Sequence, residues 1–236
     1  MSKRFLPLLA IIAVALALYA SGLHRQLSLA ALRDHEPELR AFVDAHYFVA
    51  VAAFVALSAT VIAASVPVGI FLTVAGGFIL GPWVAGAALS FAATLGAIGS
   101  YVAVRSAFGD SLRRRAERKD GVLGKVMDEL TRHTFSTVFS LRLIPLAPFW
   151  LVNVASALAN APLRAYALAT LIGIMPATFI YSSVGAGIGQ VLARGGEPNL
   201  KIIFEPYVIG PLVALGLLSL GTTVFQRLRT RKGPAS

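Results

Sequence analysis

An arginine and an asparagine flank two prolines inside an apolar stretch, and these are the residues of the chain best suited to chemistry. Arg142, Pro145, Pro148 and Asn153 follow one another as R-x-x-P-x-x-P-x-x-x-x-N. Each proline opposes a continuous helix, and an arginine in a membrane usually marks a pathway or a pairing site. The stretch therefore predicts a broken helix whose arginine binds an anion, with phosphate best suited to its several fixed donors. The alternative is that Arg142 snorkels to a nearby interface and the prolines only kink a helix.

The composition indicates an all-α integral membrane protein. Of 236 residues, 57% are hydrophobic and only 14% are charged, which is far from a soluble domain. The net charge of +10 is concentrated at the edges of apolar stretches, where basic residues set orientation and attract lipid head groups. No aromatic and basic interleaving is present, so we expect no nucleic-acid partner. Cysteine is absent, which excludes disulfides and thiolate ligands.

The apolar segments lack the groups that catalysis needs. They contain no aspartate or glutamate between Asp44 and Asp110, or between Glu129 and Glu197. Neither paired carboxylates nor a Ser-His-Asp set nor a group of metal ligands is evident in them. We therefore expect no enzyme activity, no cofactor and no metal.

Two segments predict hairpins because each has two apolar limbs around a proline break. Residues 47–82 break at Pro67, and the second limb carries Gly76 and Gly77, which would let the hairpins touch, before ending at Gly81. Residues 135–162 break at Pro145 and Pro148. We expect Asn153 to satisfy backbone groups that the prolines free. A long span follows each hairpin, and the second span, 163–189, contains Pro176.

The remaining segments flank this hairpin-containing domain, which covers residues 47–190. Residues 1–46 predict a transmembrane helix at Phe5–Leu23, with a signal peptide as the alternative, and a polar outer loop. Residues 191–236 predict a last transmembrane helix and a basic tail. The basic stretch 108–134 predicts either a membrane-surface helix or a cytoplasmic linker.

The distribution of basic residues constrains the topology. The positive-inside rule would place Lys3 and Arg4, the cluster from Arg113 to Lys119, and the tail all in the cytoplasm. These positions agree only if both hairpins are re-entrant and enter from opposite sides. The fold class we predict is therefore an inverted repeat of re-entrant hairpin plus transmembrane helix, with flanking transmembrane helices.

The order of these motifs resembles the DedA/SNARE-associated Golgi (VTT domain) superfamily. The resemblance covers roughly residues 60–190 and rests on Val66-Pro67, the run from Ala75 to Gly81, the R-x-x-P-x-x-P motif with its asparagine, and Gly173 to Pro176. By position, Arg142 matches the family's second-hairpin arginine, and Pro145, Pro148 and Asn153 match its hairpin scaffold. We expect Arg142 and Asn153 to contribute to substrate binding. We expect the hairpin scaffold to consist of Pro67, Gly76, Gly77, Gly81, Pro145, Pro148 and Pro176.

The resemblance also implies a function. Members are linked to envelope homeostasis, to recycling of a polyprenyl-phosphate carrier and to phospholipid scrambling, so we expect a lipid transporter or scramblase in a bacterial inner membrane. Both termini would be cytoplasmic, the partners would be membrane lipids with anionic phosphate head groups, and a homo-oligomer is an open possibility. The chain lacks the acidic first-hairpin residues of DedA proteins in the narrow sense, which disfavours proton coupling through a carboxylate. The alternatives are a non-transporting assembly factor and a lipid-modifying enzyme.

Overall fold

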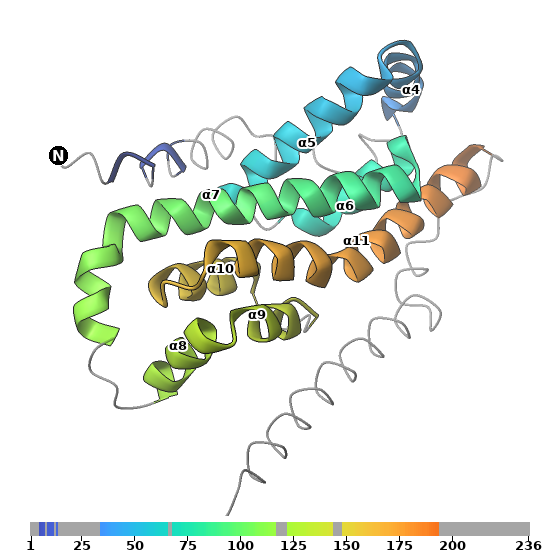
Figure 1. Ribbon diagram of the computed structural model, residues 1–236. Coiled ribbons are helices and arrows are strands. Elements are labelled where there is room, and N and C mark those ends of the chain that lie inside the picture. The colour runs from blue at the N-terminus through green and yellow to red at the C-terminus, as the bar shows by residue number, and fades with distance from the viewer. Residues whose placement is uncertain are drawn as a thin grey trace, which may run out of the picture.

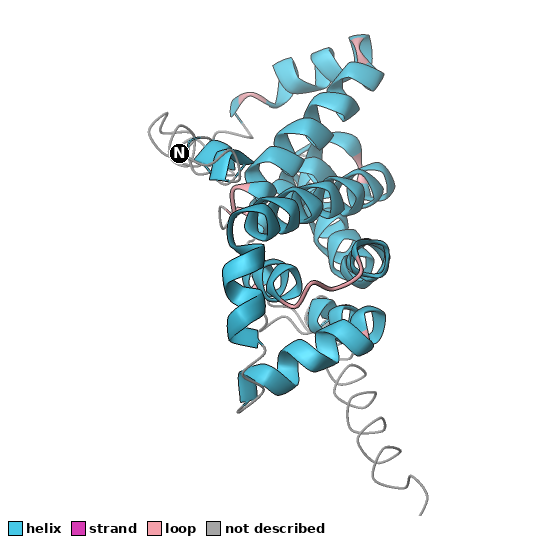
Figure 2. Ribbon diagram, turned by 60° about the vertical axis from the view of Figure 1, so that its left-hand side comes forward, coloured by secondary structure: helices cyan, strands magenta, loops and turns pink. Residues whose placement is uncertain are grey.

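The computed structural model describes residues 5–7, 9–11, 13, 34–65, 68–116, 122–143 and 148–193. Nearly all of them lie in helices, and none of these described residues forms a strand (Figure 2). In chain order the helices are α4 (Glu36–Ala45), α5 (Tyr47–Ala63), α6 (Gly69–Leu80), α7 (Pro82–Ala116), α8 (Val122–Arg132), α9 (Thr134–Leu143), α10 (Phe149–Leu158) and α11 (Leu163–Ala193). The all-α prediction is therefore confirmed for this part of the chain.

Two long helices, α7 and α11, lie side by side in the middle of the molecule (Figure 1). They run antiparallel, because Ser182 Oγ donates to Pro82 O at 2.9 Å near one end and Tyr166 Oη lies 3.4 Å from Ala97 O towards the other. The stretches Pro82–Phe108 and Leu163–Val191 are long and apolar enough to cross a membrane. The bent pair α4 and α5, at 116°, is a third candidate span, so the chain is a membrane protein as predicted.

Shorter helices pack around this central pair, and their main partners correspond in the two halves of the chain, although α6 also packs on α7. The first limbs, α5 and α9, pack on the long helix of their own half, which is α7 for α5 and α11 for α9. The second limbs, α6 and α10, pack on the long helix of the other half. This pairing agrees with the expected inverted repeat, although the repeat itself stays a prediction.

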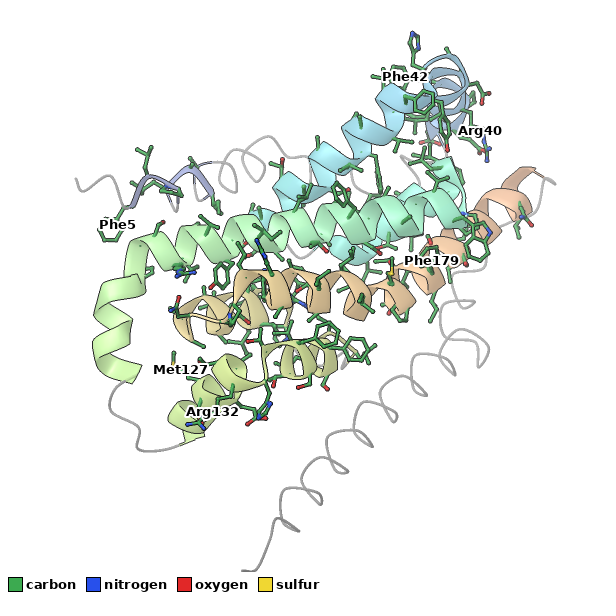
Figure 3. The ribbon with its side chains drawn as sticks, in the orientation of Figure 1. Phe5, Arg40, Phe42, Met127, Arg132 and Phe179 are labelled. Carbon is green, nitrogen blue, oxygen red and sulfur yellow. The ribbon has the colours of Figure 1, made fainter. Side chains whose placement is uncertain are left out.

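The two ends of each hairpin meet. Before and after the α9–α10 hairpin, Thr131 Oγ1 donates to Ala159 O at 2.9 Å. At the α5–α6 hairpin, the guanidinium of Arg40 in the preceding helix α4, labelled in Figure 3, lies 5.7 Å from the centre of the Phe78 ring in α6. Thus α5–α6 and α9–α10 both fold back on themselves, at opposite ends of α11.

Backbone conformation explains where the second limbs stop. Gly81 ends α6 with a φ of 79°, which glycine adopts without strain. Asn160 follows α10 with a φ of 54°, and asparagine is among the few other residues that tolerate the left-handed region. Pro82 and Pro162 then mark the starts of α7 and α11, where a missing amide donor costs little.

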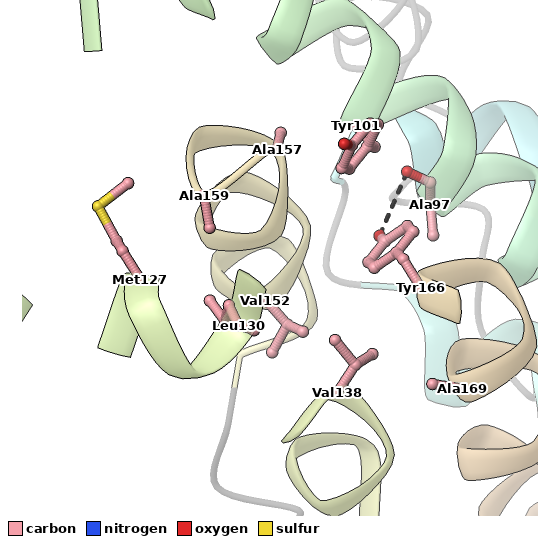
Figure 4. Packing of buried hydrophobic residues seen from close by; sticks show 10 residues of the cluster. All are labelled: Ala97, Tyr101, Met127, Leu130, Val138, Val152, Ala157, Ala159, Tyr166 and Ala169. Carbon is pink, nitrogen blue, oxygen red and sulfur yellow. Dashed lines mark hydrogen bonds between the residues drawn. The ribbon is translucent and has the colours of Figure 1, made fainter. Parts of the chain in front are cut away.

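Helix α8 docks on the bundle. Met127 and Leu130 are buried in a cluster that includes Val152 and Ala159, so the apolar face of α8 covers α10 (Figure 4). Neither interpretation of residues 108–134, as a membrane-surface helix or as a linker, anticipated this contact. The amphipathic spacing predicted a helix correctly, but it could not show that the apolar face would be covered by protein.

Several predicted features lie wholly or partly outside the described residues. These are the N-terminal span Phe5–Leu23, the C-terminal span Tyr207–Phe225, the basic tail, Pro67 and Pro145.

Candidate functional site

Arg142 lies in the last turn of α9, and its side chain is buried inside the bundle with 9% exposure. Its Nη1 donates to the backbone oxygen of Phe149 at 3.2 Å. Its Nη2 donates to Asn153 Oδ1 at 2.6 Å and makes longer contacts with Tyr166 Oη at 3.3 Å and Thr170 Oγ1 at 3.4 Å. One guanidinium therefore joins three helices, α9, α10 and α11.

Phe149 connects this arginine with the first hairpin. The Arg142 guanidinium carbon lies 3.9 Å from the centre of the Phe149 ring, a close cation–π contact. The same Phe149 packs against a buried cluster drawn from four helices: Val61, Ile62, Leu72, Leu89, Ala93 and Ile174. The arginine is therefore placed beside the region where the second hairpin approaches α5, α6 and α7.

Asn153 and Tyr166 complete a buried polar layer. The Tyr166 hydroxyl lies 2.8 Å from Asn153 Oδ1 and 3.4 Å from Ala97 O of α7 (Figure 4). The Tyr166 ring also lies 5.2 Å from the Tyr101 ring, and Tyr101 Oη donates to Ala161 O at 2.7 Å. Asn153 and Tyr166 are fully buried, so these contacts are shielded from solvent.

Two donor groups in this layer lack acceptors among the described residues. Arg142 Nε and Asn153 Nδ2 are buried and form no hydrogen bond within the described structure. A buried donor left unpaired costs about 1–3 kcal/mol, so the site has unused hydrogen-bonding capacity. All of that capacity consists of N–H groups, which suits an acceptor such as a phosphate oxygen.

The positive charge of Arg142 has no carboxylate beside it. Within the described residues, the ion pairs are Arg40 with Glu36 and Arg132 with Asp128, both within exposed single helices. The acceptors around Arg142 are neutral oxygens, as the lack of acidic residues in the spans predicted. The site therefore combines a buried cation, unpaired donors and no anion from these parts of the chain.

Comparison with known proteins decides the family. The sequence profile of the VTT domain matches residues 66–187, which is just over half of the chain. The chain belongs to the VTT domain family. The matched range contains α6 to α10 and most of α11, and hence the whole Arg142 layer.

Similar proteins include the Transmembrane protein 41 homolog of Dictyostelium discoideum, 32% identical over 197 residues, which covers 80% of this chain and 55% of that protein. The Caenorhabditis elegans homolog is 30% identical over 132 residues, or 54% of this chain and 52% of the relative. Human Transmembrane protein 41B is 27% identical over 100 residues, or 42% and 32%. The chain thus spans about half or less of the length of these relatives. No solved structure matches this chain.

The first-hairpin glycines of the VTT domain make close contacts, but with other elements than we expected. A Cβ at Gly76 would lie 2.5 Å from Phe54 Cζ of α5, and one at Gly77 would collide with the backbone of Ser182 in α11. The expectation that these glycines bring the two hairpins together is therefore wrong. They bring α6 against α5 and against the long helix of the other half.

The prolines have separate positions. Pro148 is the N-cap residue of α10 and directly precedes Phe149, and its scaffold role stays a prediction. Pro176 lies inside α11, one turn after Gly173, and so belongs to a long span instead of a hairpin. Gly173 faces the site directly, since a Cβ there would lie 2.8 Å from Arg142 Cβ.

Sequence reasoning missed three residues of the layer and misjudged a fourth. Phe149, Tyr166 and Thr170 were not singled out, although a tyrosine and a threonine four residues apart within an apolar span form a polar pair on one face. Asn153 was expected to serve freed backbone groups, but its oxygen binds the side chains of Arg142 and Tyr166. Asn153 and Arg142 lie on either side of a helix break, so the sequence alone does not reveal their contact.

Proposed function

We propose that this VTT domain protein is a membrane lipid transporter or scramblase in which Arg142 binds the phosphate of a lipid head group. The substrate is a phospholipid or a polyprenyl phosphate. The protein supports envelope homeostasis in a bacterial inner membrane, and both of its termini lie in the cytoplasm. Asn153 assists by offering its amide N–H groups. The opposed hairpins form the inverted repeat through which the lipid crosses.

One observation carries the proposal: Arg142 is buried, lacks a carboxylate partner in the described structure, and sits beside unpaired donors of its own and of Asn153. A phosphate supplies both the missing charge and the missing acceptors. Arginine matches phosphate geometry through paired N–H groups, whereas a solely structural arginine is better served by a fully satisfied network. Membership of the VTT domain family adds the expectation of lipid handling.

The test is lipid translocation in proteoliposomes that contain fluorescent phosphatidic acid or a fluorescent diacylglycerol without phosphate. We expect Arg142→Lys to reduce translocation of phosphatidic acid, because the charge stays but the planar fork is lost. We expect Arg142→Ala to abolish it, at equal abundance of folded protein.

Because Arg142 also joins three helices, each variant is compared at equal folded fraction, measured by thermal unfolding in detergent. Arg132→Ala, which removes an exposed arginine from α8, is the matched control. Translocation by Arg142→Ala at the parent rate would overturn the site. Chemical change of the head group would instead indicate an enzyme, and absence of translocation by the parent would favour the assembly factor.

A further inference from the structure

Three residues of α7 form a ladder that leads from the end of the helix towards Arg142. Ala97, Tyr101 and Arg105 are spaced by four, so they share one face of α7. Ala97 O lies 3.4 Å from Tyr166 Oη, Tyr101 Oη donates to Ala161 O at 2.7 Å, and Arg105 Nη1 donates to Tyr101 Oη at 3.2 Å. This face therefore points at the second hairpin and at the start of α11.

Arg105 is an oriented cation that forms no ion pair with the described residues. Its side chain is exposed, yet its guanidinium carbon lies 5.9 Å from the centre of the buried Tyr101 ring. The ion pairs in the described parts of the chain involve Arg40 and Arg132, not Arg105. A guanidinium has five N–H donors, and the contact with Tyr101 uses one of them. Within the described structure, most of its donors therefore remain available to a ligand that approaches from outside.

Arg105 lies near one end of the candidate membrane span of α7, where lipid head groups are expected. The apolar stretch of α7 ends at Phe108, so Arg105 lies within its last turn. Two helical turns, or about 12 Å at 1.5 Å per residue, separate it from Ala97, whose oxygen contacts the same tyrosine as Arg142. The paired rings of Tyr101 and Tyr166, 5.2 Å apart, lie between the two arginines.

We propose that Arg105, oriented by Tyr101, is an outer binding site for the phosphate group of an anionic lipid on its way to Arg142. This inference rests on the proposed function of Arg142, which it extends by a second phosphate position at the membrane surface. The ligand chemistry is a phosphate ester with free anionic oxygens, which accept the paired N–H groups of arginine. The acyl chains stay in the membrane, beside the exposed apolar face of α7 around Val102 and Phe108.

Binding to the detergent-solubilised full chain tests this site. The probes are fluorescent phosphatidic acid and a fluorescent diacylglycerol with the same chains. In the Arg142→Gln background, Arg105→Gln should weaken binding of phosphatidic acid about tenfold, as expected for a charge-assisted hydrogen bond. Binding of diacylglycerol should not change. Arg105→Lys should weaken binding less, and Arg132→Gln should leave it at the parent level.

Translocation in proteoliposomes separates the outer site from the inner one. Arg105→Gln should raise the lipid fraction that gives the half-maximal rate and leave the maximal rate unchanged, whereas Arg142→Gln should lower the maximal rate. The outer site would be overturned if Arg105→Gln and Arg132→Gln bound phosphatidic acid equally well and reached the half-maximal rate at the same lipid fraction. Arg105 would then be only an interfacial anchor. Competition by inorganic phosphate at the concentration of the lipid would overturn the assignment to a lipid. If the parent does not translocate but its binding depends on Arg105, the proposed function fails and the outer site stands.

Discussion

At the scale of single residues, Arg142 is stabilised by dipoles and an aromatic ring. Removing a guanidinium from water is costly, and neutral acceptors offset only part of that cost. Its hydrogen bonds to Asn153 and Phe149 involve a charged donor, for which about 1.5–3 kcal/mol each is typical, and the Phe149 ring adds a cation–π contact. A phosphate would therefore stabilise a charge that the described part of the protein only partly stabilises.

The hydroxyl of Tyr166 gives a prediction about this layer. Tyr166→Phe keeps the ring but removes the group that contacts Asn153, Ala97 and Arg142. We expect a loss of about 1 kcal/mol of stability, because buried acceptors lose a partner, and a translocation rate between those of the parent and Arg142→Ala. Thermal unfolding and proteoliposome assays measure the two effects.

Tyr181→Phe is the matched control, since Tyr181 is on the same helix and its hydroxyl makes no hydrogen bond within the described structure. The hydrogen-bonding role of Tyr166 would be contradicted if both variants lost the same stability and rate.

The residue scale also shows what the sequence could predict about the site. Arg142 stood out because a charge in an apolar stretch needs a reason. Its partners did not stand out, because Phe149 and Tyr166 are ordinary residues of apolar helices. Tyr166 and Thr170 lie 24 and 28 positions further along the chain, and only the fold brings them to the guanidinium. The substrate-binding role of Asn153 stays a prediction, and its hydrogen bond with Arg142 was not predicted.

At the scale of helices, the breaks were predictable and the packing partners were not. Proline and glycine mark the ends of α6 and α10 and the start of α7, so the expected limbs coincide closely with observed helices. The helices are apolar on most sides, however, and such a helix does not reveal which face meets which neighbour. That is why Gly76 and Gly77 were assigned to the wrong contact.

The crossing of α6 and α11 depends on Gly77 and Gly185. A Cβ at Gly185 would collide with the backbone oxygen of Val74, and one at Gly77 with the backbone of Ser182. Both collisions are with main chain, so the helices must separate to accept a methyl group. We expect Gly185→Ala to destabilise the protein by about 1–3 kcal/mol, the usual cost of overpacking.

Gly187→Ala tests the same helix two residues further along. Its Cβ would have no atom within 4 Å, so the substitution should be neutral or slightly stabilising through helix propensity. Thermal unfolding of both variants in detergent measures the difference. Equal midpoints would contradict the close approach of α6 and α11.

At the scale of the whole molecule, the two halves pair their helices alike but differ in polarity. The second hairpin carries Arg142 with Asn153, whereas α5 and α6 contain no charged residue. The predicted phosphate site is therefore one-sided, in the half of the chain that contains the second hairpin. A cation on one hairpin alone would hold the phosphate near the end of the bundle that also carries Arg105.

The last prediction concerns how this frame sits in a membrane. Each hairpin has its ends together, at Thr131 with Ala159 and at Arg40 with Phe78, so neither hairpin can cross as one straight span.

Single cysteines at the exposed positions Glu129 and Arg164 flank the second hairpin and should both react with a membrane-impermeant maleimide from one side. Cysteines at the exposed positions Asp44 and Gln190 should react only from the other side, because α11 crosses between them and Arg164. The parent has no cysteine, so each signal reports one position. Labelling of Glu129→Cys and Arg164→Cys from opposite sides would show that α9 and α10 together cross the membrane once. That result would overturn the re-entrant hairpin together with the inverted repeat.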